Sequence, residues 1–174
     1  MRITMAMFLS GLARLVLLAC LSPTLLCAGE KAWWETAKPE IVRIDKPISA
    51  DEAKGRCPIA LPPEAKNVYY AVYSHVIAYE SFVRFEIPYA KGIEFAEEVF
   101  KAHARKMGWS FTKPQTLQLS GKPELDFEPR KELKVSWFDI QGIRKGVTIG
   151  KLVSWQPQVW IDEERNLFFY CLTD

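Results

Sequence analysis

Several common signatures of function are missing from this 174-residue sequence. It has only two histidines, no Cys-X-X-Cys pair, no Gly-X-Ser-X-Gly motif and no Asn-X-Ser/Thr glycosylation site. These absences exclude the usual thiol redox motif and the nucleophile elbow of α/β-hydrolases. The missing glycosylation site favours a bacterial envelope over secretion from a eukaryotic cell. No motif in the sequence therefore identifies a reaction or a ligand.

The first part of the chain, residues 1–29, has the pattern of a cleavable secretory signal. Arg2 and Arg14 are its only charged residues, and they precede a short apolar run over Leu15–Leu21. A basic start, a short apolar stretch and small residues at the cleavage site are what such a signal requires. We expect cleavage within residues 27–30 and export to the bacterial periplasm or the cell exterior.

A membrane anchor and a lipoprotein signal are the alternatives to a cleaved leader. The apolar run that ends at Ala28 is broken by Pro23 and is shorter than the roughly 20 residues that cross a bilayer. Acylation at Cys20 would leave an odd number of cysteines in an oxidising space, whereas cleavage after Cys27 leaves an even number. We therefore expect a soluble exported protein without a transmembrane anchor, and a lipid anchor at Cys20 is the minor alternative.

The composition of the expected mature chain argues against nucleic-acid binding and against disorder. Two of the 23 Lys and Arg residues lie in the leader, so the remaining basic residues equal the 21 acidic residues in number. A neutral chain without a basic cluster lacks the electrostatic footprint of a nucleic-acid-binding protein. All six tryptophans lie after the leader, which favours a folded core rich in large rings.

Residues 30–66 are poorly periodic and contain five prolines. Proline lacks an amide donor and fixes the backbone, so this segment is predicted to be an extended arm. Within it, Ser49 and Glu52 have the spacing of a capping box, which predicts one helical turn. A single domain is predicted to follow over residues 67–174.

Hydrophobic periodicity predicts the main elements of this domain. Val68–Val76 is rich in strand-forming residues and Ser81–Ile87 alternates apolar and polar residues, which predicts an antiparallel hairpin. Apolar residues at steps of three and four predict one amphipathic helix over Ala90–Met107, and Gly108 is suited to end it. His103 falls within the apolar stripe and is interpreted as a core histidine.

The rest of the domain is predicted to be mostly strands. The predicted strands cover 109–112, 133–140, 147–153, Val159–Ile161 and Leu167–Leu172, and the last two form a hairpin. The fold class is therefore α+β, with an antiparallel sheet of five or six strands and one main helix packed on one face.

Two cysteines remain after the expected cleavage, Cys57 and Cys171. In an oxidising compartment such a pair is expected to form a disulfide, here between the arm and the last strand. A zinc site with His75 and His103 is disfavoured, because the four residues lack the close paired spacing of structural zinc ligands. We predict the disulfide, and we predict no catalytic, metal or cofactor-binding residues.

The absence of a catalytic motif and the many aromatic residues favour a non-enzymatic exported module. It is expected to bind a protein or an envelope component through an aromatic or strand-edge surface. Carbohydrate binding is an alternative, because exposed indole rings can stack on sugars. The candidate tryptophans for that role are Trp33, Trp34 and Trp155.

A small exported hydrolase is a further alternative. It would use His75 as a base together with a carboxylate that the fold supplies, such as Glu80 or Asp139. Ser74 is not a suitable nucleophile for His75, because adjacent residues of a strand point to opposite faces.

Overall fold

The computed structural model describes residues 37–174, with the exception of residue 126 and residues 151–154. The predicted leader and the first part of the predicted arm lie outside the described residues, so their predictions stay predictions. Residues Lys38–Asp174 form one compact unit. The described part of the arm therefore belongs to the same unit as the strands that follow it.

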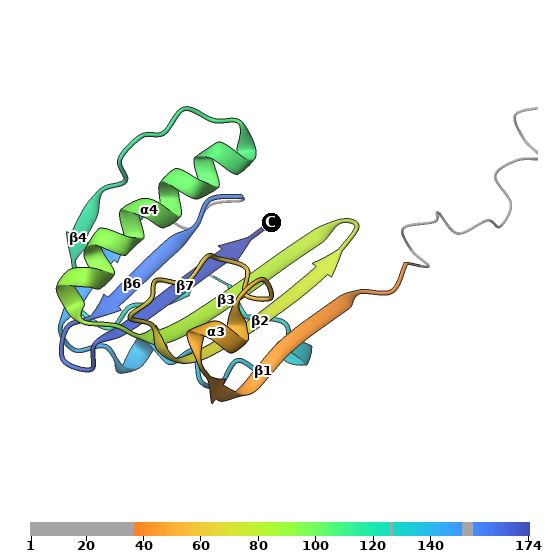
Figure 1. Cartoon of the computed structure of the whole chain (residues 1–174), viewed down its shortest axis with the longest axis horizontal. Coiled ribbons are helices and arrows are strands. Elements are labelled where there is room, and N and C mark those ends of the chain that lie inside the picture. Colours follow the sequence, from red (N-terminus) through yellow and green to blue (C-terminus); the bar gives the residue numbers. More distant parts are fainter. Residues whose placement is uncertain (1–36, 126, 151–154) are drawn as a thin grey trace, which may run out of the picture. The chain divides into compact units, whose positions relative to one another are not determined.

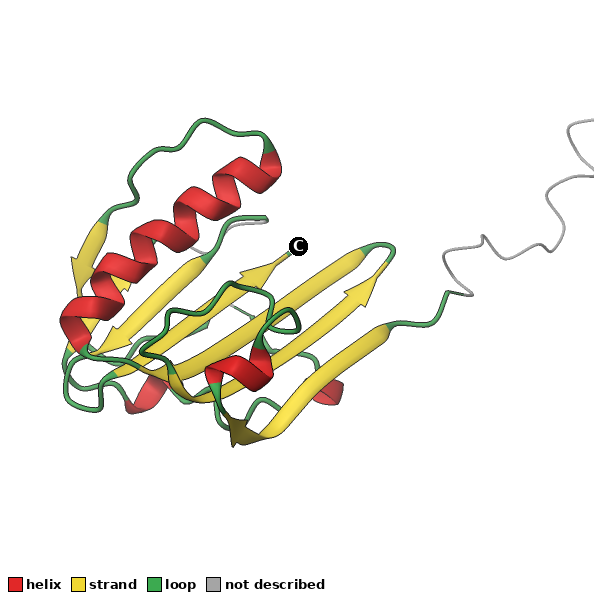
Figure 2. Cartoon of the chain, viewed as in Figure 1, coloured by secondary structure: helices red, strands yellow, loops and turns green. Residues whose placement is uncertain are grey.

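The unit is an α+β fold with a fully antiparallel sheet, as the sequence predicts (Figures 1 and 2). The seven strands are β1 (Glu40–Ile48), β2 (Lys66–His75), β3 (Ala78–Glu86), β4 (Thr116–Gln118), β5 (Gly146–Ile149), β6 (Gln158–Asp162) and β7 (Leu167–Thr173). They lie side by side in the order β1-β2-β3-β7-β6-β5-β4. The sheet is wider than the predicted five or six strands because it includes β1 from the arm and the short edge strand β4.

Both predicted hairpins are confirmed. β2 pairs with β3 through a turn at Val76 and Ile77, and β6 pairs with β7 through the loop after Asp162. Asp162 shapes that loop, because its Oδ1 accepts the backbone N–H groups of Glu164 and Arg165, each at 2.9 Å. The two hairpins join through β3 and β7, which makes the last strand of the sequence a central strand of the sheet.

The predicted helix is also confirmed, as α4 (Tyr89–Met107). It ends at Gly108, which adopts the left-handed conformation with φ 69° and donates its N–H to the carbonyls of Ala104 and Arg105. The apolar stripe of α4 packs over β6 and β7 (Figure 1). Gly92 permits this close approach, because a Cβ there would lie 3.2 Å from Cγ2 of Ile161.

The described part of the arm contains two regular elements. β1 pairs antiparallel with β2 at one edge of the sheet, where a proline is tolerated because one side of the strand has no neighbour. The predicted helical turn is confirmed as α3 (Ala50–Ala53), and Ser49 and Glu52 form the predicted capping box. Ser49 Oγ accepts the N–H of Glu52 at 3.2 Å, while Glu52 Oε2 accepts the N–H of Ser49 at 2.8 Å.

Two predicted strands are wrong. The segment 109–112 is irregular, and the segment 133–140 is made of turns and parts of two short 3-10 helices, η1 (Lys131–Leu133) and η2 (Ile140–Gly142). Lys134 has φ 49°, which is incompatible with a strand. The apolar residues of the second segment are instead buried against the face of the sheet opposite α4.

Both faces of the sheet are therefore covered. Alternate residues of β7 illustrate this, since Phe168 and Tyr170 face α4 while Phe169 and Cys171 face the segment that contains η1 and η2. None of the helices in the part of the chain that the structure describes is long and apolar enough to cross a membrane.

Candidate binding site

Exposed apolar side chains lie at two places near one end of the sheet, the tip of the β2–β3 hairpin and the end of β7. The seven exposed large apolar residues among those described are Ile41, Val76, Ile77, Trp109, Phe111, Leu117 and Trp155. Val76 and Ile77 form the tip of the β2–β3 hairpin. Trp155 lies beside the end of β7, because its N–H donates to the carbonyl of Thr173 at 2.8 Å. The β2–β3 turn and the end of β7 lie at the same end of the sheet (Figure 1).

His103 connects the two exposed tryptophans of this region. Its Nε2 forms a hydrogen bond with the carbonyl oxygen of Trp155 at 2.7 Å, and its ring meets the Trp109 ring edge to face with centroids 5.9 Å apart. Trp155 and Trp109 remain 40% and 45% exposed. We call the surface formed by Val76, Ile77, Trp109 and Trp155 the end surface.

The backbone holds Trp155 in an uncommon conformation. Its φ is 62°, in the left-handed region, which is unfavourable for a bulky residue. Hydrogen bonds from two different elements, His103 of α4 and Thr173 of β7, fix the residue there. Strain of this kind persists where the surroundings over-determine it, and such positions cluster at functional sites.

A cavity of about 290 Å³ lies next to the end surface, between α4 and the segment Pro58–Ala60. We call it the α4 cleft. Phe95 and Val99 form its helix wall, and Tyr170 and Leu172 contribute to its floor. His103 lines the cleft as well, so the same side chain borders both the cavity and the end surface. His103 is thus a half-buried rim residue of the cleft and not the core histidine that the helical stripe predicts.

The lining of the cleft includes two tyrosines. Tyr79 and Tyr170 both line the cleft, and burial raises the pKa of each, while Ser81 partly opposes both shifts by hydrogen bonding. Ser81 is fully buried beside these two tyrosines and does not itself line the cleft.

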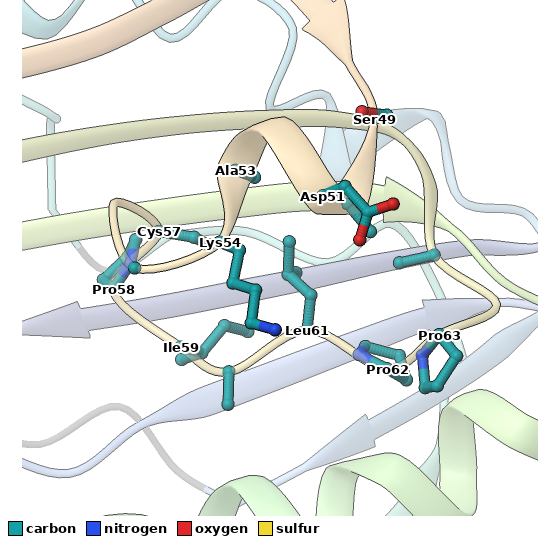
Figure 3. Close-up of a pocket in the computed structure, with 14 residues that line it drawn as sticks. Ser49, Asp51, Ala53, Lys54, Cys57, Pro58, Ile59, Leu61, Pro62 and Pro63 are labelled. Carbon is teal, nitrogen blue, oxygen red and sulfur yellow. The ribbon is translucent and has the colours of Figure 1, made fainter.

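A larger cavity, of about 770 Å³, shares the segment Pro58–Ala60 with the α4 cleft (Figure 3). Its walls are α3 and the chain from Cys57 to Pro63, as Figure 3 shows. All of its lining comes from the single stretch 49–65. The segment Pro58–Ala60 therefore lines two cavities on the α4 side of the sheet.

The structure does not contain the predicted disulfide. Among the described residues both cysteines are free thiols. Cys57 packs with the apolar cluster on the α4 side of the sheet, whereas Cys171 belongs to the cluster on the opposite side. Burial raises the pKa of Cys57 to about 12 and that of Cys171 well above its usual value. Both thiols are therefore protonated and poorly nucleophilic near neutral pH.

The two carboxylates of the hydrolase hypothesis have partners in the structure. Glu80 lies on the same face as His75, and Arg130 contacts both of its carboxylate oxygens, with Nε 2.8 Å from Oε1 and the backbone N–H donating to Oε2 at 3.2 Å. Asp139 precedes η2 and accepts the N–H of Gly142 at 3.0 Å. The hydrolase alternative stays a prediction.

The four residues considered for zinc are spread over both faces of the sheet. Across residues 37–125, 127–150 and 155–174, no three His, Cys, Asp or Glu side chains come together as metal ligands would. Of the tryptophans proposed for carbohydrate binding, Trp155 is exposed at the end surface, and Trp33 and Trp34 lie outside the described residues.

Sequence reasoning missed two parts of the end surface. The sequence prediction places Trp109 in a strand and does not place Ile77 at the tip of the hairpin. The useful signal for Trp109 is its position directly after the helix-ending Gly108. The exposure of Ile77 depends on the turn ending one residue beyond the predicted strand.

Comparison with known proteins supplies no relative from which a role can be transferred. No protein-family model matches the chain, and no match is found among curated proteins or solved structures.

Proposed function

We propose that this protein is an exported, non-enzymatic binding module that contacts a protein or another component of the cell envelope through the end surface. The export part rests on the sequence of residues 1–29. The binding part rests on the exposed apolar side chains at the tip of the β2–β3 hairpin and beside the end of β7.

The observation that carries the proposal is the position of Trp155. Two hydrogen bonds hold its backbone in an unfavourable conformation, and its side chain remains 40% exposed. Large exposed aromatic residues that cluster together are typical of interaction surfaces, where they lose solvent contact only in the complex. A core role for these rings would instead bury them.

The proposal is tested with a double variant, Trp109→Ser with Trp155→Ser, and with Leu117→Ser as its matched control. Leu117 has a similar exposure, but it pairs with Thr148 on the face of the sheet opposite α4. The melting temperature of each protein is measured with and without fractionated envelope components. We expect one fraction to raise the melting temperature of the wild type and of Leu117→Ser, but not that of the double variant.

Two results would contradict the proposal. Either no fraction shifts the melting temperature of the wild type, or the melting temperature of the double variant shifts as that of the control does. The export part is tested separately, by determining the N-terminal residue of the protein recovered from the envelope of its host. A chain that keeps Met1 and stays in the cytoplasm would refute it.

Carbohydrate binding is the second candidate, because Trp155 and Trp109 both keep exposed indoles and His103 contacts the backbone of one and the ring of the other. Soluble cell-wall and storage glycans are titrated while tryptophan fluorescence is recorded. A saturable change that the double variant loses would favour a glycan over a protein as the partner.

A further inference from the structure

We propose that the α4 cleft binds a small aromatic carboxylate that carries a hydroxyl group on its ring. This ligand site is separate from the end surface, although His103 borders both. Three features of the cleft lead to this chemical class: its apolar walls, the cations at its rim and the hydroxyls at its floor.

The walls and the volume favour a compact ring. Phe95 and Val99 on α4, Ile59 on the opposite segment and Leu172 on β7 supply apolar contacts. A cavity of about 290 Å³ lies at the small end of the range of ligand sites, which mostly combine apolar walls with a few placed polar groups. A single ring with a short side chain matches this space better than a long acyl chain.

The rim has positive charge without matching negative charge. Glu98, which lines the cleft, is already paired with Lys101, whose Nζ lies 3.0 Å from Oε1. Arg105 and Lys106 also line the cleft, and neither forms an ion pair with a carboxylate in the described part of the chain. The lysines earlier on the helix do have glutamate partners, as the pair Lys91–Glu94 at 2.9 Å illustrates.

Cations in the last turn of a helix also favour its C-terminal dipole, so their charge alone does not define a ligand. Their position on the wall of an apolar cavity is the additional feature. A carboxylate bound there would receive charge-assisted hydrogen bonds, which are stronger than those between neutral groups.

The tyrosines at the floor of the cleft favour a ligand that has a hydroxyl group on its ring. Tyr170 is only 3% exposed and lines the cleft together with Tyr79. Both tyrosines also lie near the buried Ser81, so the floor of the cleft has polar groups among its apolar walls. A ring hydroxyl that enters the cleft would donate to or accept from these tyrosines.

The experiment uses 3-(4-hydroxyphenyl)propanoate as the probe, and isothermal titration calorimetry of the purified protein as the measurement. Two analogues test the parts of the proposal. 3-(4-hydroxyphenyl)propanol lacks the carboxylate, and 3-phenylpropanoate lacks the ring hydroxyl. We expect the probe to bind roughly tenfold more tightly than either analogue, since each loses one set of polar contacts.

Two substitutions of exposed alanines on α4 locate the site. Ala102 lines the cleft, so Ala102→Trp should fill it and abolish binding. Ala90 lies at the other end of the helix, away from the cleft, so Ala90→Trp should bind as the wild type does. Lys106→Gln should weaken the binding of the probe and leave the affinity for 3-(4-hydroxyphenyl)propanol unchanged. Circular dichroism of each variant verifies folding.

The proposal is overturned by the absence of saturable binding, by equal affinity for the probe and the alcohol, or by undiminished binding to a folded Ala102→Trp protein. The Trp109→Ser, Trp155→Ser double variant separates this proposal from the proposed function. It keeps every wall, rim and floor residue of the cleft, so it should bind the probe even if the end surface has lost its partner.

Discussion

Arg130 and Glu80 form a partly buried ion pair on the face of the sheet opposite α4. Arg130 Nε lies 2.8 Å from Glu80 Oε1, and the guanidinium also lies over the ring of Tyr73, 4.4 Å from its centroid. Glu80 is 7% exposed and is the register partner of Tyr73 on the neighbouring strand. The ion pair therefore holds the loop that contains Arg130 against β3, a central strand of the sheet.

Removing the guanidinium should cost stability. Arg130→Ala leaves the Glu80 carboxylate buried with only the backbone N–H as partner, and an unsatisfied buried acceptor costs about 1–3 kcal/mol. We expect a loss of that size in the free energy of unfolding, measured with urea. In the double variant with Glu80→Gln the loss should be smaller, because no buried charge remains. An unchanged midpoint for Arg130→Ala would show that the ion pair contributes nothing.

The thiols should be countable and slow to react. Because Cys57 and Cys171 lie on opposite faces of the sheet, we expect the purified domain to contain two free thiols after denaturation. In the native state both should react slowly with iodoacetamide at pH 8, since only the thiolate is nucleophilic and burial raises the pKa of Cys57 to about 12. A count of zero free thiols would support the disulfide predicted from the sequence. It would require the turn around Cys57 to pack differently.

Stability should fall in alkaline solution. Burial raises the folded-state pKa values of Cys57, Cys171, Tyr70, Tyr79 and Tyr170 above their ordinary values. These groups keep their protons in the folded state at a pH where the unfolded chain loses them. The unfolded state then binds fewer protons, so the free energy of unfolding decreases as the pH rises.

This decrease should begin near pH 9, the ordinary pKa of a thiol, and should continue through the ordinary tyrosine pKa of 10.0. Urea unfolding between pH 7 and pH 11 measures it. Cys57→Ala should flatten the first part of the profile and Tyr79→Phe the second. Equal slopes in the wild type and both variants would refute the assignment to these groups.

One glycine of the sheet should be irreplaceable. A Cβ at Gly146 on β5 would collide with the backbone carbonyl of Ile161 on β6, and backbone atoms cannot move aside without breaking the pairing of the two strands. We expect Gly146→Ala to lower the free energy of unfolding by about 1–3 kcal/mol or more, as overpacking does. Gly121→Ala is the control, because no atom lies within 4 Å of a Cβ at that position, and its change should stay within about 0.5 kcal/mol.

The elements that the sequence predicts correctly are those with local signals. Each of these signals depends on residues that are close together in the sequence. They are the alternation in β3, the helical stripe of α4 and the spacing of Ser49 and Glu52. The segment 133–140 fails for a physical reason, because Leu133, Val135 and Trp137 alternate as a strand would. Their common apolar side covers the sheet and does not extend it, and nothing in the local pattern distinguishes these two uses.

The candidate site depends on long-range arrangement, so less of it is predictable. The sequence offers Trp155 as a candidate only because it is a tryptophan, and it predicts a core position for its partner His103. Their contact depends on where the end of α4 meets the end of β7, and the two residues lie 52 positions apart in the sequence. The α4 cleft depends in the same way on the arm crossing back over the sheet at Pro58–Ala60.

The position of β7 between β3 and β6 has a consequence for how the chain acquires its structure. β3 is synthesised before α4, yet one of its edges stays without a partner until residues Leu167–Thr173 have been added. Pairing between strands so distant in sequence slows folding, because the entropy of closing the long intervening chain is lost before the contacts form. A chain that completes its sheet only at its last strand stays unfolded for longer after synthesis, as the proposed export through a translocation channel would require.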